Sequence, residues 1–165
     1  MQEITTILTP VDFSDNAAKI AASAAYVAGT FQAKLYFVIV VQNFEDYSGF
    51  FVPPVSMPNL EEKLFESAQQ RMDAFLQEIR PVLDKYGMGE AEGKVLAGDV
   101  GEEILNYADE IACNLIIMGT HGYKGLERIM FGSVADKVVK TACCPVLTIN
   151  PYRRECEGAE PRETD

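Results

Sequence analysis

The fold of this chain is decided by the stretch Asn114–Val134, which reads Asn-Leu-Ile-Ile-Met-Gly-Thr-His-Gly-Tyr-Lys-Gly-Leu-Glu-Arg-Ile-Met-Phe-Gly-Ser-Val. Its first apolar residues, Leu115 to Met118, form a short run whose length and bounds are typical of a fully buried strand. The run ends at Gly119, and further glycines follow before Ser133. Beyond Ser133 the apolar residues recur at helical spacing on one face. That face holds Val134, Val138, Val139 and Ala142. The stretch therefore predicts a strand, a glycine-rich loop and the start of a helix.

The glycine-rich loop indicates an anion-binding site. Backbone N–H groups are free at the start of a helix, and glycines let a ligand approach the backbone closely. Gly119 and Gly122 are separated by two residues, Gly122 and Gly132 by nine, and Ser133 follows directly. This spacing differs from the compact Rossmann fingerprint and from the Gly-Lys-Ser/Thr of the Walker loop. We interpret the three glycines as a phosphate cradle, because ordinary turns alone would not dictate this spacing.

The rest of the chain alternates predicted strands and helices. Strands are predicted at Ile4–Val11, Lys34–Val41, Glu92–Ala97 and Val146–Ile149. Helices are predicted from Asp15 to about Gly29, over Leu60–Tyr86, after Asp99 and over Ser133–Ala142. This alternation predicts an α/β fold, in which one doubly wound domain has a parallel sheet with helices on both faces. Ligands of such sheets bind beyond the carboxyl ends of the strands, at a topological switch point.

Polar residues mark the expected helix starts. Ser14 is expected to cap the first helix, with Asp15 adding negative charge to its first turn. The segment Asp99–Glu102 resembles a capping box. Ser133 could cap the last helix, with Asp136 completing the box, and could also donate its hydroxyl to a phosphate. The long connection from Gln42 to Asn59 either packs its aromatic residues on the body of the protein or acts as a flap or dimer contact.

Composition excludes several classes of partner. A chain of 165 residues predicts one domain, and its formal net charge of −11 argues against nucleic acid and anionic membranes as partners. No apolar run approaches the roughly 20 residues that span a bilayer, and no signal peptide is visible at Met1. We therefore expect a cytoplasmic protein.

The cysteines do not suggest a metal site. They are Cys113, Cys143, Cys144 and Cys156, they form no C-x-x-C pair, and the chain has a single histidine. One interpretation is mostly buried thiols in a reducing compartment. The other is a redox switch at the adjacent pair, although a disulfide between neighbouring residues is strained.

Three segments together resemble the universal stress protein family. The glycine spacing followed by Ser133 matches the G-2x-G-9x-G-(S/T) signature of its ATP-binding branch. Ile7–Ser14 resembles the family's first strand, and Cys144–Ile149 resembles its last. The resemblance covers roughly residues 3 to 150, in the right order. It implies a single domain over residues 1–150 with a five-stranded parallel sheet in the order 3-2-1-4-5, the adenine nucleotide alpha hydrolase-like fold. We expect the charged tail, residues 151–165, to be disordered.

The same resemblance assigns the site. It implies that Asp12 contacts the nucleoside, that Pro10 and Val11 line the base pocket, and that the Val40 backbone recognises adenine. It also implies that the Val134 N–H joins the phosphate site. The family often has a histidine just before the valine that corresponds to Val40, where this chain has Ile39. The predicted nucleotide-binding residues are Pro10, Val11, Asp12, Val40, Met118, Gly119, His121, Gly122, Gly132, Ser133 and Val134.

Charged side chains in the loop leave alternatives open. His121 could act as a general base or phosphate partner, or it could matter only through its main chain. Lys124 and Arg128 could neutralise phosphates or lie solvated on the surface. No second catalytic group stands at a readable spacing, so no catalytic residue is assigned.

The resemblance implies a regulatory, stress-response module that binds ATP, with Mg²⁺ or Mn²⁺ held through the phosphates and no metal ligated by the protein. It also implies a homodimer formed through the last strand. One alternative is a slow ATPase or self-phosphorylating protein that uses the same site. Others are a flavin or other electron-transfer domain, and a dimeric interaction module with an empty site, against which the retained glycine signature counts.

Overall fold

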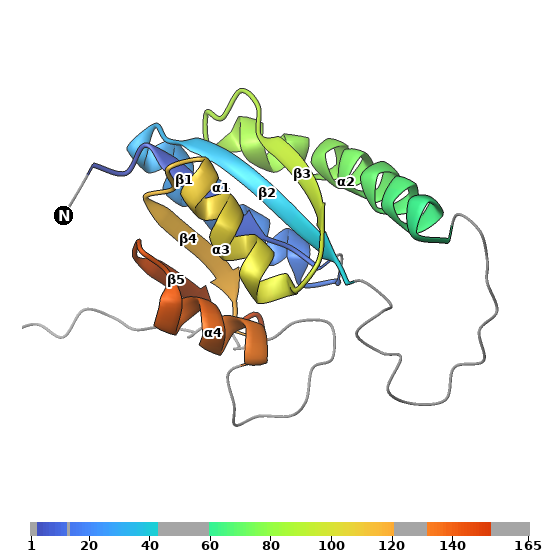
Figure 1. Cartoon of the computed structure of the whole chain (residues 1–165). Helices are drawn as coiled ribbons and strands as arrows, with labels where there is room; N and C mark the ends of the chain where they lie inside the picture. The colour runs from blue at the N-terminus through green and yellow to red at the C-terminus, as the bar shows by residue number, and fades with distance from the viewer. Residues whose placement is uncertain (1–2, 13, 43–59, 121–131, 153–165) are drawn as a thin grey trace, which may run out of the picture.

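The computed structural model describes residues 3–12, 14–42, 60–120 and 132–152. Five strands form one parallel sheet in the order β3-β2-β1-β4-β5, which confirms the predicted topology (Figure 1). The strands are β1 (Thr6–Pro10), β2 (Lys34–Val41), β3 (Glu92–Ala97), β4 (Leu115–Gly119) and β5 (Val146–Ile149). The helices are α1 (Ala17–Phe31), α2 (Leu60–Lys85), α3 (Val100–Glu110) and α4 (Ser133–Thr141).

Each face of the sheet has its own hydrophobic core. Successive strand residues point to opposite faces, so Ile7 belongs to one core and Leu8 to the other. The first core is covered by α1 and α2, and the second by α3 and α4. The central strands are therefore apolar on both faces, as their continuous hydrophobic runs predict.

Helix α1 packs on the sheet through small side chains. Its buried residues are Ala17, Ile20, Ala21, Ala24, Ala25 and Ala28. Their small volume lets the helix lie close to the sheet, as the alanine-rich sequence indicates. At Gly29 a Cβ added to the helix would overlap the carbonyl of Tyr86, the residue that follows α2 (Leu60–Lys85).

The predicted start and cap of α1 are wrong. The helix begins at Ala17, its N-cap is Asn16, and its first turn holds no acidic residue. The reason is local: the Ser14 N–H donates to Asp12 Oδ1 at 3.0 Å, and the Ala17 N–H donates to the Ser14 carbonyl at 2.9 Å. These bonds hold residues 14–16 in a turn between β1 and the helix. The helix also extends past Gly29 to Phe31.

The predicted cap of α3 is confirmed. Asp99 is its N-cap, and its carboxylate accepts the Glu102 N–H at 2.9 Å. The residue before it, Gly98, has φ of 146°, a conformation that favours glycine. The Gly98 N–H donates to the Val41 carbonyl at 3.0 Å, so the turn into α3 is tied to the end of β2.

Candidate functional site

The topological switch point lies between β1 and β4. These strands are neighbours in the sheet, with Ile7 level with Leu115 and Leu8 level with Ile116. The chain leaves β1 for α1 on one face and leaves β4 toward α4 on the other (Figure 1). The carboxyl ends of the two strands therefore meet where the connections diverge, which is where such folds bind ligands.

Asp12 lies directly beyond the end of β1. Its half-buried carboxylate is fixed by the Ser14 N–H, and Val11 before it is buried. The Val11 N–H donates to the Val38 carbonyl at 2.9 Å, which extends the contact with β2 past Pro10. The structure thus places Pro10, Val11 and Asp12 together at the switch point.

Val40 lies on the neighbouring strand, beyond the last β1 residue. The β1–β2 pairing ends with Pro10 opposite Val38, whereas β2 continues to Val41. On its other side Val40 pairs with Leu96 of β3. The edge of β2 that faces β1 therefore continues alongside residues 11 and 12.

A backbone bond joins the two ends of the connection between β4 and α4. The Gly132 N–H donates to the Thr120 carbonyl at 2.9 Å, and the Thr120 N–H donates to the Ile149 carbonyl at 2.9 Å. Met118 and Gly119 end β4, so this bond brings them near Gly132, Ser133 and Val134. His121, Gly122, Lys124 and Arg128 lie outside the described residues, as do residues 43–59 of the long connection, so the alternatives for that connection stay open.

The predicted Ser133 cap of α4 is wrong. Gly132 is the N-cap, Ser133 is the first helical residue, and no side chain caps the helix. The reason is that the Gly132 carbonyl already accepts the Asp136 N–H at 2.9 Å, which begins the helix one residue earlier than predicted. The Asp136 carboxylate pairs with Lys140 at 2.8 Å. Whereas Asp99 caps α3, the N-cap residue of α4 is a glycine, and within the described residues no side chain caps its first amides. An external anion can serve such amides.

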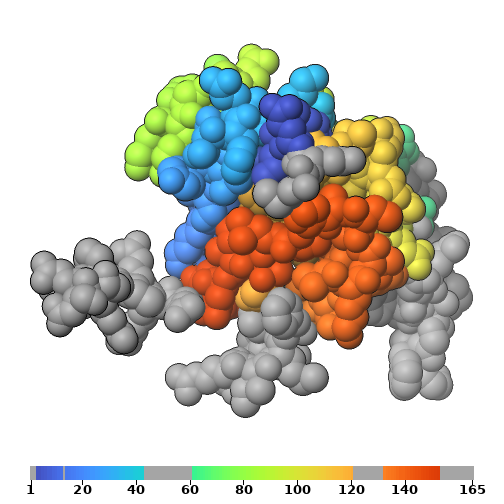
Figure 2. Space-filling view, turned by 90° about the vertical axis from the view of Figure 1, so that its left-hand side faces the viewer, coloured from blue at the N-terminus to red at the C-terminus, as the bar shows by residue number. Residues whose placement is uncertain are grey.

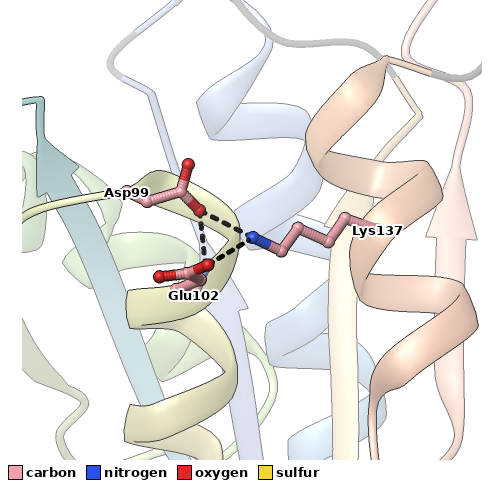
Figure 3. Close-up of polar contacts among 3 residues, drawn as sticks. All are labelled: Asp99, Glu102 and Lys137. Carbon is pink, nitrogen blue, oxygen red and sulfur yellow. Dashed lines mark hydrogen bonds and ion pairs between the residues drawn. The ribbon is translucent and has the colours of Figure 1, made fainter. Parts of the chain in front are cut away.

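Sequence reasoning missed an ion-pair cluster beside this helix. Lys137 of α4 lies between Asp99 and Glu102 at the start of α3 (Figure 3). Each charge is visible in the sequence, but the pairing depends on the two helices lying side by side. It also missed a cavity of about 460 Å³ at the carboxyl ends of β2 and β3. The cavity is lined by Val41, Gln42, Glu61, Glu62, Leu64, Phe65, Glu66 and Ala97.

The described cysteines mostly fit the interpretation of structural thiols. Burial raises the pKa of the half-buried Cys113 to about 12, and its Sγ lies 3.1 Å from the Leu115 carbonyl. Burial also raises the pKa of Cys144. Cys143 differs from that interpretation because it is exposed, and Cys156 lies outside the described residues.

Two searches of the described residues found nothing. Among residues 3–12, 14–42, 60–120 and 132–152, no three or more His, Cys, Asp or Glu side chains are grouped to hold a metal ion. Within those ranges, no helix is both long enough and apolar enough to cross a membrane.

Comparison with known proteins identifies the family. The model of the universal stress protein family matches residues 3–150, and the chain belongs to this family. A universal stress protein of Methanocaldococcus jannaschii, MJ0531, is 34% identical over 151 residues, which cover 90% of this chain and 84% of the relative. The solved structure of universal stress protein UspA from Lactobacillus plantarum is 28% identical, with a TM-score of 0.74, and covers 91% of this chain and 100% of its own.

Two more distant structures contain nucleotides. One is a universal stress protein in complex with cAMP, 18% identical with a TM-score of 0.64, covering 91% of this chain and 99% of its own. The other is the universal stress protein from Archaeoglobus fulgidus in complex with dAMP, 21% identical with a TM-score of 0.57, covering 91% of this chain and 100% of its own. At these identities the likeness is one of fold.

Proposed function

We propose that this chain binds ATP at the switch point between β1 and β4 and acts as a regulatory module in the stress response. The observation that carries the proposal is the N-terminus of α4, whose N-cap residue is Gly132 and which, within the described part of the chain, has no capping side chain. Its free amides suit a phosphate, because they are oriented donors at the positive end of the helix dipole.

Each residue of the proposed site has a role that suits its chemistry. Gly119, Gly122 and Gly132 let the phosphates approach the backbone, and Ser133 and Val134 donate to them. Asp12 accepts hydrogen bonds from the nucleoside hydroxyls. Pro10, Val11 and Met118 line the base pocket, and the backbone of Val40 recognises the adenine edge. His121 contributes from within the loop.

A divalent ion fits this proposal as a companion of the nucleotide. Mg²⁺ prefers oxygen ligands and commonly binds through substrate phosphates with few protein ligands. The absence of a grouped metal-binding set among the described residues is compatible with an ion held by the phosphates. The cAMP and dAMP complexes support the proposal only in that this fold can hold an adenine nucleotide.

The proposed role is regulatory because chemistry at this site would be slow. The chain has no Walker lysine, and no carboxylate or second histidine is placed by the sequence motif to activate water. We further propose a cytoplasmic location and a homodimer, whose interface is considered in the Discussion.

Calorimetry with ATP and magnesium tests the binding directly. We expect saturable binding by the purified protein, and a raised ratio of absorbance at 260 to 280 nm if nucleotide co-purifies, since the chain has no tryptophan. No heat of binding at millimolar ATP would overturn the proposal. A turnover number above about 1 per second would contradict the regulatory role, because that rate is typical of a metabolic enzyme.

A further inference from the structure

Lys137 of α4 bridges to the first turn of α3, and the two helices run side by side on one face of the sheet. Its Nζ lies 3.0 Å from Asp99 Oδ1 and 3.1 Å from Glu102 Oε1 (Figure 3). The lysine belongs to α4, whereas Asp99 is the N-cap of α3 and Glu102 lies in the first turn of that helix. Helix α3 follows β3 after two residues, and α4 is the next described helix after β4, so both begin beyond the carboxyl ends of strands. The cluster therefore lies at the edge of the sheet that carries the proposed site.

The lysine stem is held in place by packing. A Cβ added to the buried Gly101 would lie 2.7 Å from Lys137 Cδ, so the stem crosses α3 where that helix has no side chain. The contacts within the cluster also shift the pKa values of Asp99 and Lys137. The Glu102 N–H and then Lys137 lower the pKa of Asp99, while the two carboxylates raise the pKa of Lys137. The ammonium is therefore placed between these carboxylates by both packing and charge.

The backbone of Lys137 lies about one helical turn beyond the amides that would receive the phosphates. Lys137 lies four residues after Ser133, which is about 6 Å along a helix at 1.5 Å per residue. This separation is comparable to the screening length at physiological ionic strength, about 8 Å. Without Lys137, two uncompensated carboxylates would face the N-terminus of α4, in a chain whose formal net charge is already −11.

We propose that Lys137 is a positioning residue of the nucleotide site. It ties the second turn of α4 to the first turn of α3 and neutralises Asp99 and Glu102, whose charges would otherwise repel the phosphates. The inference rests on the proposed binding of a nucleotide at α4. Isolated ion pairs on the surface contribute little to stability. The proposal instead gives this exposed cluster a role in nucleotide binding.

The test compares the affinities of AMP, ADP and ATP for wild type and Lys137→Met, which keeps an unbranched stem and removes the charge. We expect ATP affinity to fall roughly threefold to tenfold, ADP affinity less and AMP affinity least, because repulsion grows with phosphate charge. The ratio of wild-type to variant affinity should shrink in added salt. Lys137→Arg, which keeps the charge, should bind almost as wild type.

Two further variants separate neutralisation from a structural effect. Adding Glu102→Gln to Lys137→Met removes one of the stranded charges and should recover part of the ATP affinity. Glu102 is chosen because Asp99 also caps α3. Arg80→Met is the matched control: Arg80 also forms an exposed ion pair, with Asp84 on α2. This variant changes the net charge by the same amount as Lys137→Met. Because Arg80 lies near the end of α2 that leads into β3, away from the carboxyl edge of the sheet, ATP affinity should not change.

The outcomes distinguish the two proposals. If wild type binds ATP and Lys137→Met either binds it equally well or loses AMP, ADP and ATP by the same factor, the role of Lys137 is wrong and the nucleotide site stands. Failure of Glu102→Gln to recover affinity would also overturn the role. If wild type binds none of the three nucleotides, the proposed function and this inference both fall.

Discussion

At the scale of single residues, Thr9 of β1 conflicts with its surroundings. Its side chain is fully buried, and Oγ1 has no hydrogen-bond partner within the described part of the chain. It lies on the same face of β1 as Ile7 and Val11, toward the core beneath α1 and α2. A buried hydroxyl without a partner is costly, because it loses its hydrogen bonds to water.

Thr9→Val should therefore stabilise the protein. Valine has nearly the same shape and removes the unpartnered hydroxyl, so the free energy of unfolding should rise by about 1 kcal/mol. Urea unfolding followed by circular dichroism measures the change. Thr9→Ser is the matched control: it keeps the hydroxyl, loses a buried methyl group and should destabilise by about 1 kcal/mol. A valine variant less stable than wild type would mean that the hydroxyl has a partner after all.

At the scale of elements, the sequence predicted the strand, loop and helix of the central stretch because their signals are local. The run Leu115–Met118 and the spacing of the glycines are readable without neighbours. The caps were predicted less well: the Asp99 cap is confirmed, whereas Ser14 and Ser133 are not caps. Local hydrogen bonds decide those two: the Ser14 N–H donates to the Asp12 carboxylate before α1, and the Asp136 N–H donates to the Gly132 carbonyl at the start of α4. Capping propensity alone cannot anticipate such bonds.

The candidate site also divides into residues that local sequence signals could place and residues whose place depends on packing between helices. Asp12 and Gly119 could be brought together from sequence, since each ends a predicted strand and the strand order came with the family resemblance. Lys137 could not be placed, because its contacts with Asp99 and Glu102 depend on how α3 packs against α4. Gly132 also needs a revised explanation: its φ of −57° suits any residue, so backbone strain does not require glycine there. The proposed reason for glycine is the space that it leaves for the phosphates.

Gly132→Asp should therefore separate folding from binding. An aspartate at the N-cap can accept an amide of α4 and complements the helix dipole, so stability should rise by a few tenths of a kcal/mol. The same carboxylate would occupy the place proposed for the phosphates and repel them, so ATP affinity should fall by at least tenfold. Thermal unfolding and calorimetry measure the two effects. Unchanged ATP binding would show that the phosphates do not use the N-terminus of α4.

At the scale of the whole molecule, α4 and β5 form one face of the protein (Figure 2). Strand β5 is an edge of the sheet, and Leu147 is 42% exposed. Val139, predicted to share an apolar face of α4 with Val138, is 46% exposed, whereas Val138 is buried. The Pro145 and Ile149 carbonyls accept bonds from the β4 side. Alternate residues of a parallel strand direct their N–H and C=O groups to opposite sides. Since Pro145 and Ile149 face β4, the backbone groups of Val146 and Thr148 point away from it. An edge with apolar side chains and unpaired backbone groups is a template for pairing with another strand.

We expect two copies of the chain to pair through β5, because pairing of one edge with itself closes a two-fold dimer. Light scattering at micromolar concentration should give twice the monomer mass of 18.2 kDa. Thr148→Pro removes a backbone N–H donor that points away from β4, so the measured mass should shift toward that of the monomer. We expect the dissociation constant of the dimer to rise at least tenfold. Thr5→Pro would be a poor control because the Thr5 N–H bonds Asn114. Glu90→Pro, outside the strands and helices, serves better and should leave the dimer intact. A wild-type mass of one chain would contradict pairing through β5.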